Sequence, residues 1–170
     1  MGGIISIEST KGLGTTVTVQ LQFKEAAAPA DTNKGTMPAL KNVDFTGKKV
    51  LLCEDNELNR EIACALLEEK GLRVTSAADG AQGLRAFSES MPFEYTAILM
   101  DIRMPVMDGF EATKAIRALA RQDAKTIPIF ALTADAFADD IQKCLAAGMN
   151  GHVAKPIDSE QMFATLATAL

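Results

Sequence analysis

Five polar side chains follow four short apolar runs of this sequence. Glu54 and Asp55 follow the first of these runs, Asp101 follows the next, and Thr133 and Lys155 follow the last two. Three carboxylates held close together raise one another's pKa values, and a bound divalent cation relieves that repulsion. Oxygen ligands with open, water-filled positions favour Mg²⁺, whereas zinc prefers nitrogen and sulfur. The pattern therefore predicts a magnesium site.

The same side chains are suited to phosphoryl chemistry. A carboxylate-bound Mg²⁺ can hold phosphoryl oxygens and neutralise their charge. Lys155 would offer a point cation to a further oxygen, and Thr133 would offer a hydroxyl. Asp101 is then free to act as a nucleophile and form an aspartyl-phosphate. The charges support this hypothesis, because Mg²⁺ and Lys155 together balance Glu54, Asp55 and Asp101.

These five residues come together only if the apolar runs are parallel strands. From residue 48 onward, apolar runs alternate five times with stretches of helical periodicity. Continuous apolar runs are typical of a parallel sheet covered on both faces. The alternation predicts an α/β fold, a doubly wound (βα)5 sheet with right-handed crossovers and a ligand crevice at the carboxyl ends of its strands. We expect strands at 50–53, 73–76, 97–100, 127–131 and 152–154, and helices near 57–70, 80–90, 109–121, 136–147 and 159–169.

Local signals refine two of these helices. Asp108 stands directly before the helix expected from residue 109, where it is a suitable N-cap. Ile62, Ala63, Leu66 and Leu67 form an apolar stripe on the helix expected at 57–70. Such a stripe predicts the face that packs on the sheet.

The first 46 residues differ in character from the rest. Apolar and polar residues alternate strictly from Val17 to Phe23, and a shorter apolar run spans Ile4 to Ile7. This pattern predicts an N-terminal β-hairpin within residues 1–24. A lone hairpin is marginal in water, so its apolar face needs a covering partner. Residues 25–46 are small, polar and rich in proline and glycine, which favours a linker.

Composition excludes several classes of protein. The 170 residues carry a formal net charge of −5, which argues against an electrostatic nucleic-acid binder. The three cysteines are far apart without a CxxC pair, so neither a disulfide framework nor a zinc site is expected. Neither a run of 18 apolar residues nor a signal-peptide pattern is present, so we expect a cytoplasmic location and no membrane contact by this stretch.

Residues 48–170 resemble the receiver domain of two-component response regulators, and we place the domain boundaries at 47–170. The resemblance lies in LCEDNELNR from Leu52, ILMDIRMPVMDG from Ile98, ALTA from Ala131 and the pair Lys155-Pro156. It implies a flavodoxin-like sheet with strand order 2-1-3-4-5. It also implies a phosphorelay function with Mg²⁺ as the cofactor.

The resemblance implies a role for each acidic residue. Asp101 would be the phosphoacceptor, charged by a phosphohistidine on a partner. Asp55 would bind Mg²⁺ directly and Glu54 through a water molecule, and the backbone carbonyl of Arg103 would complete the protein ligands. Glu54 departs from the family's more usual aspartate, which lengthens its reach to the metal.

The resemblance also implies a switch. Thr133 would follow the phosphoryl group inward and Lys155 would hold it, with the Lys155–Pro156 bond in the cis form. The position of the family's aromatic switch residue is occupied by His152. This departure from tyrosine or phenylalanine puts the usual coupling to Thr133 in question.

The N-terminal hairpin is similar to the last strands of a histidine-kinase ATP-binding domain, whose final glycine box matches Gly12, Gly14 and Thr15. A hairpin, a linker and a receiver in this order imply the C-terminal piece of a hybrid sensor histidine kinase, whose parent chain could be anchored in the inner membrane. The expected partners are a phosphohistidine-bearing dimerisation domain and a histidine phosphotransfer domain. Without the rest of an ATP site, this stretch is expected to have no kinase activity.

Two alternatives stay open. A magnesium-dependent phosphatase that forms an aspartyl-phosphate has a similar fold, but it needs a second aspartate two residues after the nucleophile. Arg103 occupies that position here. The other alternative is a receiver that is not phosphorylated and serves as a docking module, and the intact set of site residues argues against it.

Overall fold

The computed structural model describes residues 3–10, 12, 14–21, 43–134 and 138–169. The chain forms two units, Met1–Thr36 and Met37–Leu170, which are described separately. Most of the linker expected at 25–46 lies outside the described residues. Among the described residues, no helix has both the length and the hydropathy needed to cross a membrane.

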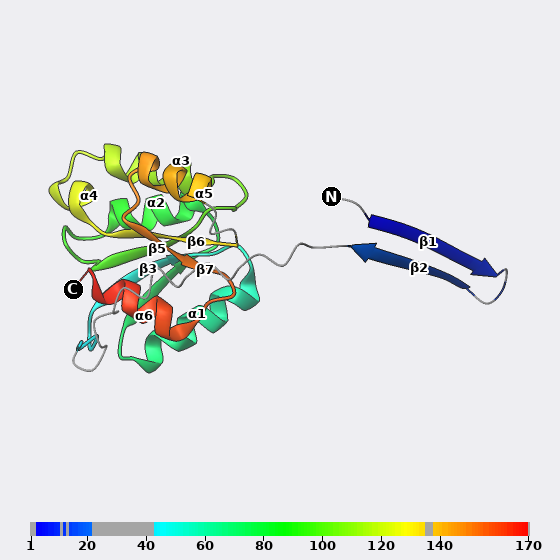
Figure 1. Cartoon of the computed structure of the whole chain (residues 1–170). Helices are drawn as coiled ribbons and strands as arrows, with labels where there is room; N and C mark the ends of the chain where they lie inside the picture. Colours follow the sequence, from blue (N-terminus) through cyan, green and yellow to red (C-terminus); the bar gives the residue numbers. More distant parts are fainter. Residues whose placement is uncertain (1–2, 11, 13, 22–42, 135–137, 170) are drawn as a thin grey trace. The chain divides into compact units, whose positions relative to one another are not determined.

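A five-stranded parallel sheet forms the centre of the second unit (Figure 1). Its strands are β3 (Lys49–Cys53), β4 (Arg73–Ala77), β5 (Ala97–Asp101), β6 (Ile129–Thr133) and β7 (Gly151–Ala154). Their spatial order is β4-β3-β5-β6-β7, which is 2-1-3-4-5 when counted from β3. The predicted flavodoxin-like fold is therefore confirmed.

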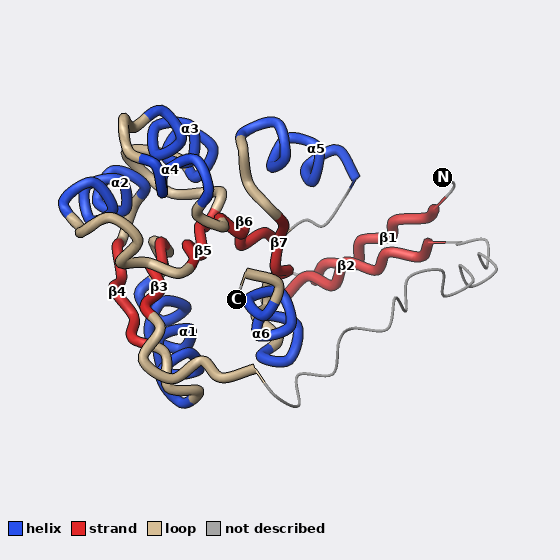
Figure 2. The backbone as a smooth tube through the Cα atoms, turned by 90° about the vertical axis from the view of Figure 1, so that its left-hand side faces the viewer, coloured by secondary structure: helices blue, strands red, loops and turns tan. Residues whose placement is uncertain are grey.

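Helices cover both faces of this sheet (Figures 1 and 2). One face carries α1 and α6, and the other carries α2, α3, α4 and α5. Every residue of the central strands β5 and β6 is buried as a result, which explains their continuous apolar sequences. The helices are α1 (Glu57–Glu69), α2 (Gly80–Glu89), α3 (Gly109–Ala118), α4 (Gln122–Thr126), α5 (Ala138–Ala147) and α6 (Ser159–Ala167).

The helix expected at 109–121 is shorter in the structure, and the following strand starts later. Helix α3 ends at Ala118, Leu119 turns to an extended conformation, and a separate five-residue helix, α4, follows. The guanidinium of Arg117 donates to the carbonyls of Ala124 and Gly148, at 2.8 and 3.0 Å, and so holds the chain after the break. Strand β6 begins at Ile129 rather than 127, directly after a proline that has no backbone N–H to donate.

The apolar stripe of α1 is only partly buried. Ala63 and Leu67 pack in the core, whereas Ile62 is 48% exposed. The predicted N-cap at Asp108 is confirmed, since its side chain accepts from the backbone N–H of Glu111 in a capping box.

The N-terminal unit is an antiparallel hairpin of β1 (Gly3–Thr10) and β2 (Gly14–Leu21). Ile5 pairs with Val19 and Ile7 pairs with Val17, so these four side chains lie on one face of the ribbon. All four are exposed. Both strands begin earlier than expected, and Phe23 lies outside the described residues. We call the four-residue surface the apolar ribbon face.

Candidate functional site

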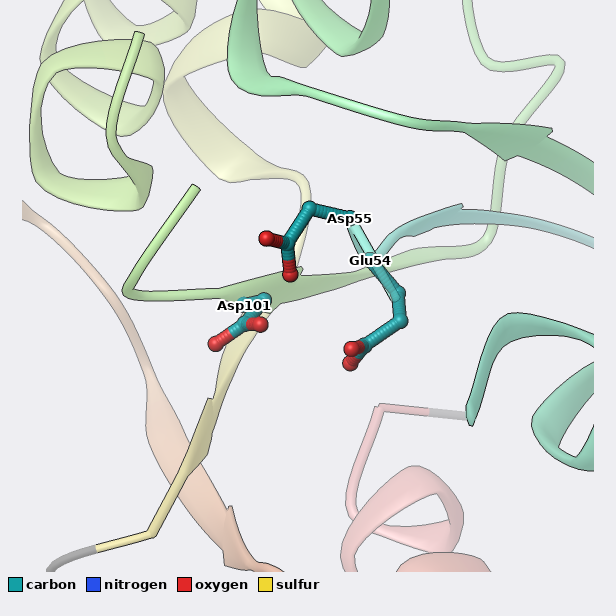
Figure 3. A group of neighbouring side chains, drawn as sticks. All are labelled: Glu54, Asp55 and Asp101. Atoms are coloured by element: carbon teal, nitrogen blue, oxygen red, sulfur yellow. The ribbon is translucent and has the colours of Figure 1, made fainter. Parts of the chain in front are cut away.

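Three carboxylates meet at the carboxyl ends of β3 and β5 (Figure 3). Glu54 and Asp55 follow β3, and Asp101 is the last residue of β5, the neighbouring strand. One carboxylate oxygen from each residue lies within 4.8 Å of the other two. Glu54 is only 1% exposed and Asp101 only 5%, whereas Asp55 is exposed to solvent. The predicted acidic cluster is therefore present.

Lys155 provides a positive charge inside this cluster. Its Nζ lies 2.6 Å from Glu54 Oε2 and 2.6 Å from Asp101 Oδ2. The Lys155–Pro156 bond is cis, as predicted, and the backbone N–H of Lys155 donates to the carbonyl of Thr133 at 2.7 Å. Two carboxylates share this ammonium and Asp55 lies beside them, so among these four residues negative charge is in excess, which is the electrostatic setting that attracts a divalent cation.

Burial and pairing shift the pKa values of this pair. Burial raises the pKa of Asp101 above its ordinary value, although the hydrogen bond from Lys155 opposes that shift. Burial lowers the pKa of Lys155, but the hydrogen bond to Asp101 and the charge of Glu54 outweigh it, so the net shift is upward. Lys155 is therefore a firmly charged ammonium at neutral pH.

The loop between β5 and α3 holds Asp101 in place. The backbone N–H of Arg103 donates to Asp101 Oδ1 at 3.2 Å, and the N–H of Gly109 donates to the carbonyl of Ile102 at 3.0 Å. A Cβ at Gly109 would overlap the carbonyl oxygen of Asp101. Only glycine therefore allows the start of α3 to pack this closely behind the aspartate.

Thr133 lies beside Asp101 at the end of β6. A cleft of about 150 Å³ is lined by Asp101, Arg103, Thr133 and Lys155, among others. Thr133 is buried, as its place at the end of a central strand requires. The structure therefore brings together all five residues that were selected from the ends of the strands.

His152 lies apart from that cleft. It is a half-buried residue of β7, paired in register with Ala131 of β6. It is not among the described residues that line the cleft. Its assignment as a switch residue stays a prediction.

Two residues of the site had no predicted role. The Asn59 amide donates to Glu54 Oε1 at 3.3 Å, and Arg60 Nη1 donates to the backbone carbonyl of Glu54 at 2.8 Å. Both lie in the first turns of α1, which Asn56 caps by accepting from the N–H of Asn59. The capping pattern was a usable signal, because it turns the start of this helix back toward the residues that precede it.

The donor set fits Mg²⁺. It consists of hard carboxylate oxygens at a rim that is partly open to solvent, as Mg²⁺ requires. Glu54 Oε2 is buried and accepts no hydrogen bond from the described residues, so its contact is the ion pair with Lys155. The site also contains the backbone of Arg103, which could supply a carbonyl oxygen.

Sequence comparison relates this chain to sensor kinases. Residues 50–167 match the model of the response regulator receiver domain. Hybrid signal transduction histidine kinase I of Dictyostelium discoideum is 39% identical over 125 residues, which are 72% of this chain and 7% of that protein. Histidine kinase 3 of Arabidopsis thaliana is 34% identical over 142 residues, covering 73% of this chain and 13% of the relative. The chain thus spans only a small part of these relatives.

Structural comparison leads to the same family. The receiver domain of a sensor histidine kinase of Pseudomonas aeruginosa, with a magnesium ion in its active site cleft, has a TM-score of 0.65 and 42% identity, covering 72% of this chain and 97% of that one. The receiver domain of the yeast response regulator Ssk1, in complex with the histidine phosphotransfer protein Ypd1, has a TM-score of 0.65 and 27% identity, covering 74% and 94%. This chain therefore belongs to the response regulator receiver domain family.

Proposed function

We propose that Asp101 accepts a phosphoryl group from a phosphohistidine and passes it to a histidine phosphotransfer domain. The observation that carries this proposal is the cleft in which Asp101, Thr133 and Lys155 meet beside Glu54 and Asp55. A buried carboxylate that faces an acidic, cation-binding rim has no evident structural purpose. It is suited to an anhydride bond to phosphorus.

The proposed transfer exchanges one bond at phosphorus for another. A carboxylate oxygen of Asp101 forms the new bond to phosphorus, and the bond from phosphorus to the imidazole nitrogen breaks. The electron pair of that bond stays on the nitrogen, and the histidine leaves as neutral imidazole because it takes one proton from water. Lys155, already 2.6 Å from Asp101 Oδ2, then pairs with a phosphoryl oxygen, and the Thr133 hydroxyl donates to another.

Glu54, Asp55, Asp101 and the backbone carbonyl of Arg103 would hold Mg²⁺. When bound, the ion neutralises negative charge on the phosphoryl oxygens. The Pseudomonas aeruginosa receiver domain, which has magnesium in its active site cleft, supports this assignment.

A partly apolar surface next to Lys155 supports a protein partner. Leu58 and Ile62 on α1 are exposed. Leu58 lies one helical turn before Ile62. A pocket of about 220 Å³ is lined by Asn59, Ile62, Lys155, Pro156 and Ile157. Exposed apolar side chains that are grouped at a reactive centre are typical of protein interfaces. A histidine phosphotransfer domain is the proposed partner, and the yeast complex between such a protein and a receiver supports the choice.

We infer further that this receiver belongs to a hybrid sensor histidine kinase with a cytoplasmic receiver, and that its hairpin ends the ATP-binding domain. Probable histidine kinase 6 of rice matches 84% of this chain, a larger share than residues 47–170 make up, so the similarity extends to some residues before the receiver. The phosphohistidine donor would then be the dimerisation domain of the same protein.

The phosphatase alternative is weaker than this proposal. Arg103 takes the place at which that chemistry needs a second aspartate, and its backbone N–H donates to Asp101 Oδ1. The role of an unphosphorylated docking module is also disfavoured, because the acceptor, the cation and the metal-binding carboxylates all lie in one place.

Incubation with acetyl phosphate and Mg²⁺ tests the proposal directly. The wild type should gain one hydroxylamine-labile phosphate, because hydroxylamine cleaves acyl phosphates, and Asp101→Asn should gain none. Asp44→Asn is a matched control, since Asp44 lies before β3 and accepts from the N–H of Thr46. Equal labelling of Asp101→Asn and wild type, or a label that resists hydroxylamine, would refute the proposal.

A further inference from the structure

Glu54 and Asp55 are adjacent in the chain, yet their carboxylates meet that of Asp101 in one place (Figure 3). One oxygen of each of the three residues lies within 4.8 Å of the other two. Successive side chains of an extended strand point to opposite faces of the sheet. Strand β3 ends at Cys53, so the chain is free to turn after it. This turn is what lets two neighbouring residues serve one cation site.

The backbone carbonyls at this turn share one donor. Arg60 Nη1 donates to the carbonyl of Glu54 at 2.8 Å and to the carbonyl of Asp55 at 3.3 Å. Carbonyls that lie beyond the end of a strand have lost the regular donors of the sheet and need another partner. The guanidinium therefore ties together the backbone of the two residues whose side chains begin the acidic rim.

Arg60 is itself held in a fixed place. It lies in the first turns of α1, where its backbone N–H donates to the carbonyl of Asn56 at 2.9 Å. The side chain of Asn56 caps this helix by accepting from the N–H of Asn59. Arg60 is half-buried, and within the described part of the chain its guanidinium pairs with no carboxylate. It therefore fixes the backbone and leaves the nearby carboxylates free for a cation.

The two acidic residues differ in how much else holds them. The N–H of Glu54 donates to the carbonyl of Ala77 at 3.1 Å, and its buried carboxylate lies 2.6 Å from Lys155 Nζ. The side chain of Asp55 is exposed to solvent, so packing does not fix it. The direction in which Asp55 projects therefore depends on the backbone that Arg60 holds.

We propose that Arg60 is a positioning residue for the cation site and sets its affinity for Mg²⁺, an inference that rests on the cation assigned in the proposed function. Arg60 contacts neither the ion nor the phosphoryl group. It acts through the backbone from which Glu54 and Asp55 reach the ion. Groups that orient metal ligands from outside are worth about tenfold or more in metal affinity.

Charge and position predict opposite results when a neutral residue replaces Arg60. Its guanidinium brings a positive charge close to the acidic cluster, and that charge repels a second cation. Removal of the charge would by itself tighten the binding of Mg²⁺. Removal of the two hydrogen bonds would loosen the backbone under the metal ligands and weaken binding. Weaker binding by a neutral variant therefore identifies the positioning effect.

The experiment measures the dissociation constant of Mg²⁺ by titration of the amide NMR signals, without a phosphoryl donor. Arg60→Met should bind Mg²⁺ about tenfold more weakly than the wild type. Arg60→Gln, which is neutral and too short to reach both carbonyls, should also bind more weakly. Arg85→Met is the matched control, because Arg85 is exposed on α2 and pairs with Glu89, and it should bind as the wild type does. With acetyl phosphate, Arg60→Met should need about tenfold more Mg²⁺ for half-maximal labelling, and saturating Mg²⁺ should restore the rate.

The outcomes separate the inference from the function on which it rests. Binding of Mg²⁺ by Arg60→Met as tight as that of the wild type, or tighter, would overturn the inference, as would an equal loss in Arg85→Met. If Arg60→Met does not fold, Arg60→Gln decides in the same way. A labelling rate that stays low at saturating Mg²⁺ would also overturn it, because Arg60 would then act on phosphoryl transfer itself. If the wild type binds Mg²⁺ but takes no label from acetyl phosphate, the proposed function fails, whereas the Mg²⁺ affinities still decide the role of Arg60.

Discussion

The two ends of the parallel sheet use charge in opposite ways. At the amino end, Arg121 Nη2 lies 2.7 Å from Asp123 Oδ2, and Lys49 Nζ lies 2.5 Å from Glu94 Oε1. Each of these two carboxylates therefore has its own cation. At the carboxyl end, Glu54 and Asp101 share the ammonium of Lys155, and the carboxylate of Asp55 lies beside them. One end is balanced within the chain, whereas the other leaves charge for a ligand to neutralise.

The ion pairs at the amino end therefore stabilise the fold, whereas the carboxylates at the carboxyl end serve the proposed function. The guanidinium of Arg121 also donates to the carbonyls of Phe87, Ser90 and Met91, and it stacks over the ring of Phe87 with its Cζ 4.5 Å from the centroid. These charged and polar groups at the amino end thus have their partners within the chain and need no ligand. The carboxyl end gives up part of this stability because like charges must stay close to hold a cation.

Arg121→Met should have the largest effect on stability. It leaves Asp123 without its cation and removes the guanidinium that donates to the backbone carbonyls between α2 and β5. Breaking a buried ion pair from one side costs about 4 kcal/mol of the free energy of unfolding. Urea denaturation would measure this loss, and Mg²⁺ should not restore it. If Mg²⁺ restored the free energy of unfolding of this variant, the amino end would not be independent of the cation site.

Lys155→Met should lose about 3 kcal/mol in metal-free buffer, because Glu54 and Asp101 then have no cation. Here Mg²⁺ should restore most of the loss, since the carboxylates that remain are its proposed ligands. Thermal unfolding with and without Mg²⁺ distinguishes the variants. A shift in melting temperature on adding Mg²⁺ no greater than that of wild type would mean that Lys155 and the cation do not share these carboxylates.

Acid should lower the free energy of unfolding over a defined pH range, through protonation of Asp123 at the amino end. Hydrogen bonds from Arg121 and from the N–H of Phe93 lower the pKa of Asp123 from 3.8 to about 2. Because the folded-state pKa is the lower one, this stabilisation is complete above pH 3.8 and is lost as the pH falls to about 2. Its size is about 2 kcal/mol. Asp123→Asn should flatten the pH dependence of unfolding in this range, and an unchanged profile would contradict the assignment.

Asp101→Asn should have the smallest effect, and one of opposite sign. Burial raises the pKa of Asp101, so its charged form is disfavoured in the folded state. Removing that charge should therefore raise the free energy of unfolding in metal-free buffer at neutral pH, by less than the changes expected for the other variants. Calorimetry of wild type and variant measures the sign. If Asp101→Asn lowered the free energy of unfolding instead, the carboxylate of Asp101 would stabilise the fold as that of Asp123 does.

The site residues at the carboxyl end of the sheet were predictable from the sequence, because one topological rule places them together. Parallel strands place their carboxyl ends together, so Glu54, Asp55, Asp101, Thr133 and Lys155 could be grouped before any coordinates were known. The order of the strands followed from the resemblance to receiver domains, and the capping of α3 by Asp108 followed from a local signal.

The amino end and the loop details were not predictable in this way. The break after α3 depends on Arg117 reaching carbonyls as far away as Gly148, and sequence periodicity carries no trace of such a contact. The loop between β5 and α3 turns at Val106, where φ is +68°, and it packs closely against Gly80 at the start of α2. Ile62 fits the apolar stripe of α1 and is nevertheless exposed, because periodicity cannot tell a core face from an interface.

The apolar ribbon face has a consequence for handling the protein. Ile5, Ile7, Val17 and Val19 are exposed on β1 and β2, which pair only with each other among the described strands, so each strand has an outer edge. Such edges are templates for pairing between chains. The full chain should therefore show scattering that grows with concentration and time, while a version that begins at residue 37 should stay monodisperse. Material prepared for binding measurements should accordingly be compared in both lengths, so that self-association is not mistaken for affinity.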